Sequence, residues 1–243
     1  MKNNIKLVPL FLFAITTLVS CTSSHSGNPA DFIAYYSFDS TLMDKSGHFN
    51  HASKYGNTIR FDEGVKNSCI RFFNKNNKTY GDVNDFLRLP NINVINFSIA
   101  FWVKYEKNNH DFQPSVYSFG DDKIGDGPRD FLVFWVLPNG TLSVSMQAGT
   151  NVSNTPQIDI SNSKWIHIAY TVGDNKICLY QNGELYYTKN IDFEHNFYNL
   201  PQYVAYHQWN NGQFYSSRFS GSVDELYIYN RELSKNEILN LAK

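Results

Sequence analysis

The chain has 243 residues, of which 42% are hydrophobic and 16% aromatic, and its formal net charge is −1. A chain of this length and apolar content can bury one sizeable core, and a single large all-β domain is allowed. The near-neutral charge gives no basic footprint, so nucleic acid is excluded as an expected partner. The 19 Phe and 16 Tyr favour sheets, in which aromatic side chains are enriched.

The first twenty residues have the character of an export signal. Lys2 and Lys6 precede the apolar run LVPLFLFAITTLV, which is too short for a comfortable membrane span. The run ends in LVSC, residues 18–21, which resembles the lipobox of bacterial lipoproteins. That resemblance implies a Cys21 that is lipidated and becomes the mature N-terminus. The alternative is an ordinary secretory peptide followed by a structural cysteine.

The lipoprotein interpretation fixes the expected organisation and location. Residues 1–20 are a signal peptide, residues 21–30 a flexible tether, and residues 31–243 one domain. Thr22 in place of an aspartate favours the outer membrane of the cell envelope, with the periplasmic or surface side left open. The only expected membrane contact is the lipid anchor.

From Asp31 onward the sequence consists of strand-like runs separated by turns. Asn-Gly pairs are the strongest short hairpin signal because both positions of a type I′ turn need positive φ. Three such pairs lie between strand-like runs: Asn139-Gly140, Asn182-Gly183 and Asn211-Gly212. They exclude alternating βαβ units, and FLVFWVL, apolar at both parities, predicts a central strand covered on both faces.

One helix is predicted, in the closing segment LSKNEILNLAK. Ser234 and Glu237 have the spacing of a capping box, and Leu233 and Ile238 that of a hydrophobic staple. The helix is expected to close a two-sheet β-sandwich of roughly a dozen strands.

Several quoted stretches carry a family resemblance: YYSFDSTLMDKSGHFNH, CIRFF, FSIAFWVK, KWIHIAYTV, ICLYQNGELYYT and FSGSVDELYIYNRELSKNEI. In this order they resemble the successive motifs of laminin-G-like domains of the concanavalin A-like lectin/glucanase superfamily, over residues 32–240. The resemblance implies an all-β jelly roll, a two-sheet antiparallel sandwich with one concave face and a short C-terminal helix. The chain departs from the family at YVAYHQW, where relatives usually have a glycine.

A structural Ca²⁺ site is expected where the two ends of the domain meet. If FIAYYSF pairs antiparallel with VDELYIY, Asp39 lies near Asp224, and Asp44 follows in the next loop. Converging carboxylates need a hard cation, and laminin-G-like relatives often hold calcium at this edge. The alternative is that Asp224 caps a turn while Asp39 and Asp44 bond loop amides. Alternation puts Glu225 on the opposite face as a surface charge.

Catalytic motifs are missing from the sequence. The glucanase branch of the superfamily resembles E-x-D-x-x-E on one strand, and the chain has no such stretch. It also lacks the strand-borne Arg, Gln and His set of jelly-roll lyases, HExxH, and cysteine clusters with zinc spacing. Cys69 and Cys178 are read as two buried thiols, with a disulfide as the alternative. No enzyme activity is expected.

The predicted function is therefore non-catalytic carbohydrate binding by an exported lipoprotein. Sugar rings present apolar C–H faces that need aromatic platforms beside a few polar groups. Tyr203, His207 and Trp209 share one parity in YVAYHQW and are expected to face outward, whereas Val204 and Tyr206 share the other parity. The other candidates, if FLVFWVL is the neighbouring strand, are Trp135 and the loop residues Arg129 and Asp130. The alternatives are a protein-interaction or adhesion domain, which would bind other cell-envelope proteins, and a glycoside hydrolase or polysaccharide lyase of the same fold.

Overall fold

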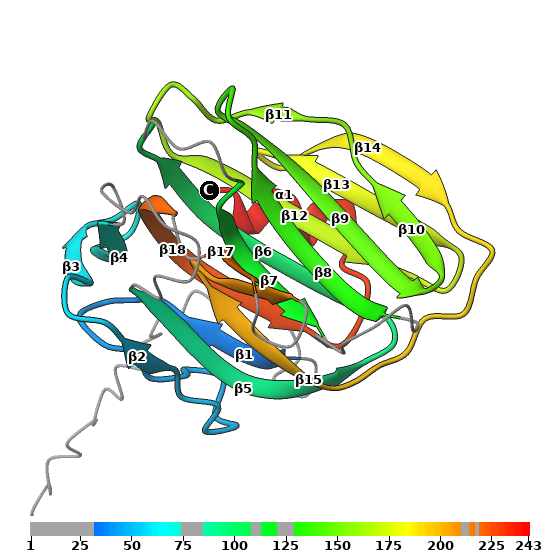
Figure 1. Cartoon of the computed structure of the whole chain (residues 1–243), viewed down its shortest axis with the longest axis horizontal. Helices are drawn as coiled ribbons and strands as arrows, with labels where there is room; N and C mark the ends of the chain where they lie inside the picture. The colour runs from blue at the N-terminus through cyan, green and yellow to red at the C-terminus, as the bar shows by residue number, and fades with distance from the viewer. Residues whose placement is uncertain (1–31, 74–84, 108–112, 121–128, 210–213, 217–218) are drawn as a thin grey trace, which may run out of the picture.

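The structure is a computed structural model that describes residues 32–73, 85–107, 113–120, 129–209, 214–216 and 219–243. Two antiparallel sheets of eight strands pack face to face, and one short helix ends the chain (Figure 1). This confirms the predicted sandwich. Within these residues no helix has the length and apolar character needed to cross a bilayer.

Sheet A contains both ends of the domain. Its strands follow the order β14-β13-β12-β6-β18-β4-β3, and β1 also pairs with β18. Their bounds are β1 (Phe32–Tyr36), β3 (Arg60–Glu63), β4 (Ser68–Phe73), β6 (Phe97–Tyr105), β12 (Ile166–Val172), β13 (Lys176–Gln181), β14 (Glu184–Asn190) and β18 (Ser220–Tyr229). The first and last strands pair antiparallel, with Tyr36 opposite Leu226, as the sequence predicted.

Sheet B forms the other layer, in the order β10-β9-β8-β7-β15-β5-β2 with β11 beside β9. Its strands are β2 (Ser53–Tyr55), β5 (Phe86–Val94), β7 (Ser115–Gly120), β8 (Arg129–Val136), β9 (Thr141–Gly149), β10 (Asn151–Asn154), β11 (Ile158–Asp159) and β15 (Phe197–Val204). A separate hairpin of β16 (His207–Trp209) and β17 (Phe214–Ser216) lies against β7 (Figure 1).

The hairpin turns follow the Asn-Gly signals. Asn182 and Gly183, between β13 and β14, have φ angles of 50° and 82°, as a type I′ turn requires. Gly140, between β8 and β9, has φ 81°. Asn211-Gly212 lies outside the described residues, between β16 and β17.

The closing helix α1 (Lys235–Leu241) has the predicted start. Ser234 accepts from the main-chain N–H of Glu237, whose carboxylate accepts from the Ser234 main-chain N–H at 2.9 Å. Leu233 and Ile238 are buried together in a cluster on the outer face of sheet A. The helix thus seals part of that face.

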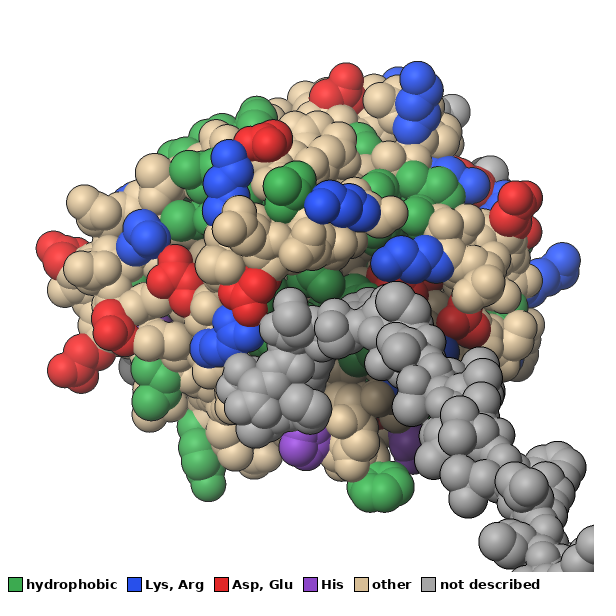
Figure 2. All heavy atoms as spheres, turned by 180° about the vertical axis from the view of Figure 1, so that it is seen from behind, with side chains coloured by type: hydrophobic (Ala, Val, Ile, Leu, Met, Phe, Trp, Pro, Cys, Tyr) green, Lys and Arg blue, Asp and Glu red, His purple; other side chains and the backbone are tan. Residues whose placement is uncertain are grey.

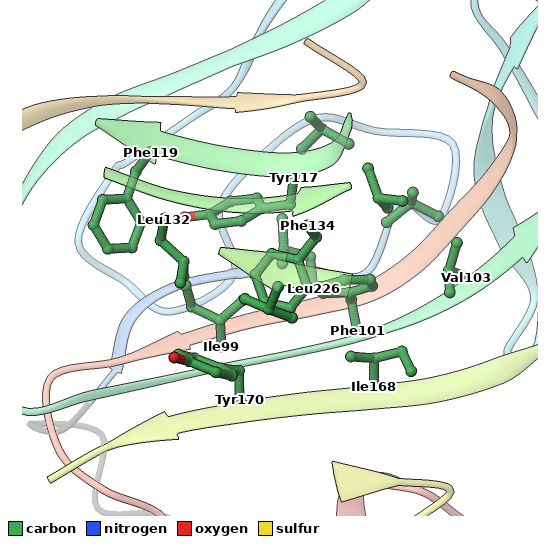
Figure 3. Packing of buried hydrophobic residues seen from close by; sticks show 14 of the residues in the cluster. Ile99, Phe101, Val103, Tyr117, Phe119, Leu132, Phe134, Ile168, Tyr170 and Leu226 are labelled. Atoms are coloured by element: carbon green, nitrogen blue, oxygen red, sulfur yellow. The ribbon is translucent and has the colours of Figure 1, made fainter. Parts of the chain in front are cut away.

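The main core fills the space between the sheets (Figure 3). Rings meet edge to face across it, as where Phe101 of β6 lies 5.1 Å from Phe134 of β8 at 74°. Leu132, Val133 and Phe134 of β8 are all fully buried, so this strand is covered on both faces as predicted. Cys69 and Cys178 are free buried thiols.

On the back of the molecule, seen in Figure 2, the visible lysines and arginines are interspersed with carboxylates. Phosphate backbones are bound by uniformly basic surfaces, which this mixture does not provide. With α1 packed on sheet A, the hairpin β16–β17 lies over sheet B (Figure 1). The hairpin that carries His207 and Trp209 is therefore on the sheet B side of the molecule.

Candidate functional site

The strand that carries the predicted aromatic residues is interrupted. Strand β15 ends at Val204, and Ala205 takes a φ of 65° before β16 begins at His207. The Ala205 N–H donates to the carbonyl of Val116 at 2.8 Å, which fixes the bend. Because the alternation breaks there, the rings of Tyr203 and Tyr206 lie 4.8 Å apart, and placing them on opposite faces was wrong.

Four aromatic residues on the outer face of sheet B form a continuous group that we call the aromatic row: Tyr55, Phe86, Tyr203 and Tyr206. The Phe86 ring stacks on Tyr55 at 4.7 Å and on Tyr206 at 4.5 Å. Phe86 and Tyr206 are buried, Tyr203 is half-buried, and Tyr55 is 44% exposed. Leu87 and Leu89, which alternate with Phe86 in β5, belong to the core, so the row faces away from it.

Trp135 and His207 lie together, as the sequence suggested. Their ring centroids are 5.0 Å apart at 87°, and Phe131 lies 6.0 Å from the same imidazole. The expectation that His207 faces solvent was wrong, because its side chain packs against Trp135 and Phe131 and is only 7% exposed. Burial lowers the pKa of His207 to about 3, so the imidazole is neutral near neutral pH.

The remaining predicted binding residues have different surroundings. Asp130 has the same parity in β8 as the core residue Leu132, and its carboxylate accepts from the Gly149 N–H at 2.8 Å. Asp130 therefore does not join Trp135, and that prediction was wrong. Arg129 and Asp130 begin strand β8 instead of lying in a loop. Trp209 ends β16; its side chain and that of Arg129 lie outside the described part.

The sequence interpretation missed Tyr55, Phe86 and Tyr206, and it also missed a polar stripe along β9. Ser143, Ser145 and Gln147 are half-buried and alternate with core residues, and Ser143 lies opposite Trp135. The alternation of residue positions along TLSVSMQ and FLRL could have indicated which side chains of these strands face away from the core. Hydroxyl and amide groups thus lie near the apolar rings of sheet B.

Two of the three predicted calcium ligands hold one turn, residues 64–68. The Asp224 carboxylate accepts from the main-chain N–H groups of Val65 at 2.8 Å and Lys66 at 3.2 Å. Burial outweighs these amide bonds and raises the pKa of Asp224 to about 7. Asp39 accepts from the Ser68 N–H at 3.3 Å and pairs with Lys45 at 3.0 Å.

Asp44 serves a different loop. It accepts from the main-chain N–H groups of Tyr35, Ser46 and Asn50 at 3.0, 2.8 and 3.0 Å. These amide bonds outweigh burial and lower its pKa. The described residues contain no group of three acidic, histidine or cysteine side chains able to hold a metal.

The expected convergence of the three aspartates was therefore wrong. Asp224 and Asp39 bond the turn at residues 64–68, whereas Asp44 bonds another loop, so within the described residues the three do not form one set of ligands. Calcium binding was an expectation from the sequence, and the main-chain bonds of these three residues argue against it at this position.

Glu225 is not the surface charge that alternation predicted. It is buried, with φ 50° at a bulge in β18 that changes the direction of its side chain. The hydroxyls of Tyr35 and Tyr227 donate to its carboxylate at 3.0 and 2.6 Å, and the Lys66 ammonium lies 3.5 Å away. The geometry indicates a structural carboxylate on sheet A.

The comparisons with known proteins agree with this architecture. A family model described as the concanavalin A-like lectin/glucanases superfamily matches residues 75–239. The chain has no significant match among curated protein sequences.

Three solved structures illustrate the similarity. Domain 4 of AbnA, a GH43 extracellular arabinanase from Geobacillus stearothermophilus in complex with arabinotriose, is 20% identical with a TM-score of 0.67, covering 88% of this chain and 98% of that one. The binding domain of botulinum neurotoxin DC in complex with SialylT is 17% identical with a TM-score of 0.65, covering 87% and 50%. The same domain with rat synaptotagmin II has a TM-score of 0.62 at 17% identity, covering 88% and 51%. This chain thus spans about half of the toxin domains, and identities this low show the fold alone.

Proposed function

Because the chain belongs to the concanavalin A-like lectin/glucanase superfamily, whose name covers both binding proteins and enzymes, we propose that it is a non-catalytic carbohydrate-binding protein. The observation that carries the proposal is the aromatic row on the outer face of sheet B. Its two outer rings, Tyr55 and Tyr203, reach the surface while Phe86 supports them from behind.

The row has the chemistry that a sugar ring requires. Flat aromatic faces pack against the C–H face of a pyranose or furanose, and nearby polar groups orient its hydroxyls. Arg88 lies opposite Tyr203 and is exposed at the same outer parity of β5 as Phe86. The stacked contacts within the row fix the ring positions before a ligand arrives, which reduces the entropy cost of binding.

The carboxylates of sheet B support binding without catalysis. Glycoside hydrolysis in most families needs two carboxyl groups that flank the scissile bond. The described strands of this sheet contain two acidic residues, Asp130 and Asp159. Asp130 accepts from Gly149, and Asp159, in the edge strand β11, accepts from the main chain and hydroxyl of Ser161 at 2.8 and 2.7 Å. Neither belongs to a pair of the required kind.

The structural neighbours support both glycan binding and its main rival. One was solved with arabinotriose and one with a sialyl ligand, whereas another was solved with synaptotagmin. A protein-interaction or adhesion domain is therefore the second candidate. In either case the LVSC junction supports a lipid anchor at Cys21 that displays the domain in the cell envelope, with the outer membrane favoured.

The test compares two tyrosines of β15 that differ in position. A glycan array and a titration with arabinotriose identify a ligand, and calorimetry then measures the Tyr203→Ala and Tyr198→Ala variants. Tyr198 lies in the same strand and is 73% exposed, outside the row. Tyr203→Ala should weaken glycan binding about tenfold or more while the melting temperature stays close to that of the wild type.

Two results would contradict the proposal. If both variants bind the glycan as the wild type does, the aromatic row is not the site. If no glycan binds but a protein from the cell envelope binds and is lost with Tyr203→Ala, the interaction function replaces the carbohydrate function.

A further inference from the structure

One arginine lies beside the aromatic row on the outer face of sheet B. Arg88 follows Phe86 by two residues in β5, so the two side chains point to the same side of the sheet. It lies directly opposite Tyr203 of β15 and Ser53 of β2. Residues opposite each other on antiparallel strands have Cβ atoms about 4.5–5.5 Å apart. A sugar ring packed on Tyr203 is therefore within reach of the Arg88 guanidinium.

Arg88 differs from other arginines of the protein in having no carboxylate partner. Arg71 pairs with Asp62 at 2.6 Å, and Arg231 pairs with Glu237 at 2.7 Å. The ion pairs among the described residues do not include Arg88, whose side chain is exposed. The N–H donors of its guanidinium are thus available to a ligand.

The strands around Arg88 carry no negative charge. β2, β5, β15 and β7 are neighbours in sheet B and have the sequences SKY, FLRLPNINV, FYNLPQYV and SVYSFG. They contain neither Asp nor Glu, and their two cations are Lys54 and Arg88. Lys54 lies opposite the core residue Leu87, so it has the other parity. Arg88 is therefore the charge that these four strands present on the outer face.

The carboxylates closest to these strands are bound elsewhere or distant. Asp85, which precedes β5, is buried and accepts from the main-chain N–H of Thr58 at 3.2 Å and from its hydroxyl. Asp130 of β8 is separated from β5 by β7 and β15, and Asp159 of β11 lies farther away. Three strand spacings amount to about 14 Å, which exceeds the screening length of about 8 Å at physiological ionic strength. These carboxylates leave the charge of Arg88 uncompensated.

An arginine beside an aromatic face is complementary to a ring that carries a planar anion. The guanidinium forms two parallel N–H···O bonds with a carboxylate, and this geometry adds specificity as well as affinity. The Tyr203 ring offers a flat surface to the C–H face of a sugar. A hexuronic acid combines the two features, because its pyranose ring has a C–H face and carries a carboxylate at its edge.

We propose that the aromatic row prefers acidic glycans, with a hexuronic acid whose ring lies on Tyr203 and whose carboxylate pairs with Arg88. The hydroxyl of Ser53, on the other side of Arg88, can bond a hydroxyl of the same sugar. The inference rests on the proposed carbohydrate-binding function and specifies the class of glycan.

The experiment compares trimers of galacturonic, glucuronic and mannuronic acid with their methyl esters, which have the same rings but no charge. Calorimetry at pH 7 and low salt should show at least one acid trimer bound about tenfold or more tightly than its ester. Arg88→Gln should lower the affinity for that acid to the affinity for the ester, because it removes the charge and keeps an amide donor. Lys54→Gln, which removes an exposed cation of the other parity, should keep the difference.

The other outcomes separate this inference from the proposed function. If neutral glycans or the esters bind as tightly as the acids and Tyr203→Ala weakens their binding, the aromatic row remains the site and the acid preference is refuted. An acid preference that survives Arg88→Gln would place the anion elsewhere and also refute it. A sulfated trimer without carboxylates, or triglutamate, bound as tightly as the best acid trimer would replace the hexuronic acid by a sulfated glycan or an acidic peptide. If no glycan of any kind binds, the proposed function fails and the inference with it.

Discussion

Replacement of His167 by phenylalanine should remove part of the acid sensitivity of the protein. The imidazole, in β12, is 1% exposed and packs edge to face on Trp102 at 5.4 Å. Neither ring nitrogen has a hydrogen-bond partner in the described residues, although the main-chain N–H donates to Asn182. Burial, with a smaller effect of the Lys66 charge, lowers the pKa of His167 to about 3.

The direction of the pH effect follows from where the proton binds. Between pH 3 and 6.5 the unfolded state binds a proton at His167 that the folded state does not, so stability falls as the pH falls. The loss is about 1.4 kcal/mol per pH unit, or about 2 kcal/mol between pH 6.5 and 5. His207 behaves in the same way. Asp224 has the opposite effect: its pKa is raised, so between pH 4 and 7 the folded state binds a proton that the unfolded state does not. Its contribution to the pH dependence of stability therefore offsets that of one histidine.

The free energy of unfolding of the wild type should therefore fall by about 1.4 kcal/mol per pH unit below pH 6.5. That of His167→Phe should hardly change with pH, because the opposite effects of His207 and Asp224 then cancel. Urea unfolding at intervals from pH 5 to 7 measures both slopes, with His48→Gln as an exposed control. At pH 7 the variant should be at least as stable as the wild type, because it removes two unpaired buried nitrogens. An unchanged slope, or a clear loss of stability at pH 7, would refute the reasoning.

Three further outcomes are expected. Glu225→Ala should lower the free energy of unfolding in urea by about 3 kcal/mol or more, because it leaves Lys66 and two tyrosine hydroxyls without their acceptor; a change below 1 kcal/mol would contradict this. Chelation of divalent cations should leave the melting temperature unchanged, because the three aspartate carboxylates already accept hydrogen bonds from main-chain N–H groups. A fall in the melting temperature that Asp44→Asn abolishes would instead support the calcium site. Cys21→Ala should abolish metabolic labelling by a fatty-acid analogue, and labelling equal to the wild type would exclude the lipid anchor.

The elements that the sequence predicted well are those specified by local chemistry. Asn182-Gly183 forms its turn because both residues accept positive φ, and Ser234 caps its helix through a bond within one turn. The central position of β8 followed from its apolar residues at both parities. None of these features depends on a distant part of the chain.

Two of the wrong predictions share one physical cause. Tyr206 and Glu225 were both placed by strict alternation, and in each case a non-glycine residue takes positive φ, Ala205 in one and Glu225 itself in the other. Such a conformation costs about 1–3 kcal/mol and persists only where tertiary contacts compensate. Those contacts, the Val116 carbonyl and the Tyr35 hydroxyl, are 89 and 190 residues away in the sequence, so no local pattern reveals them.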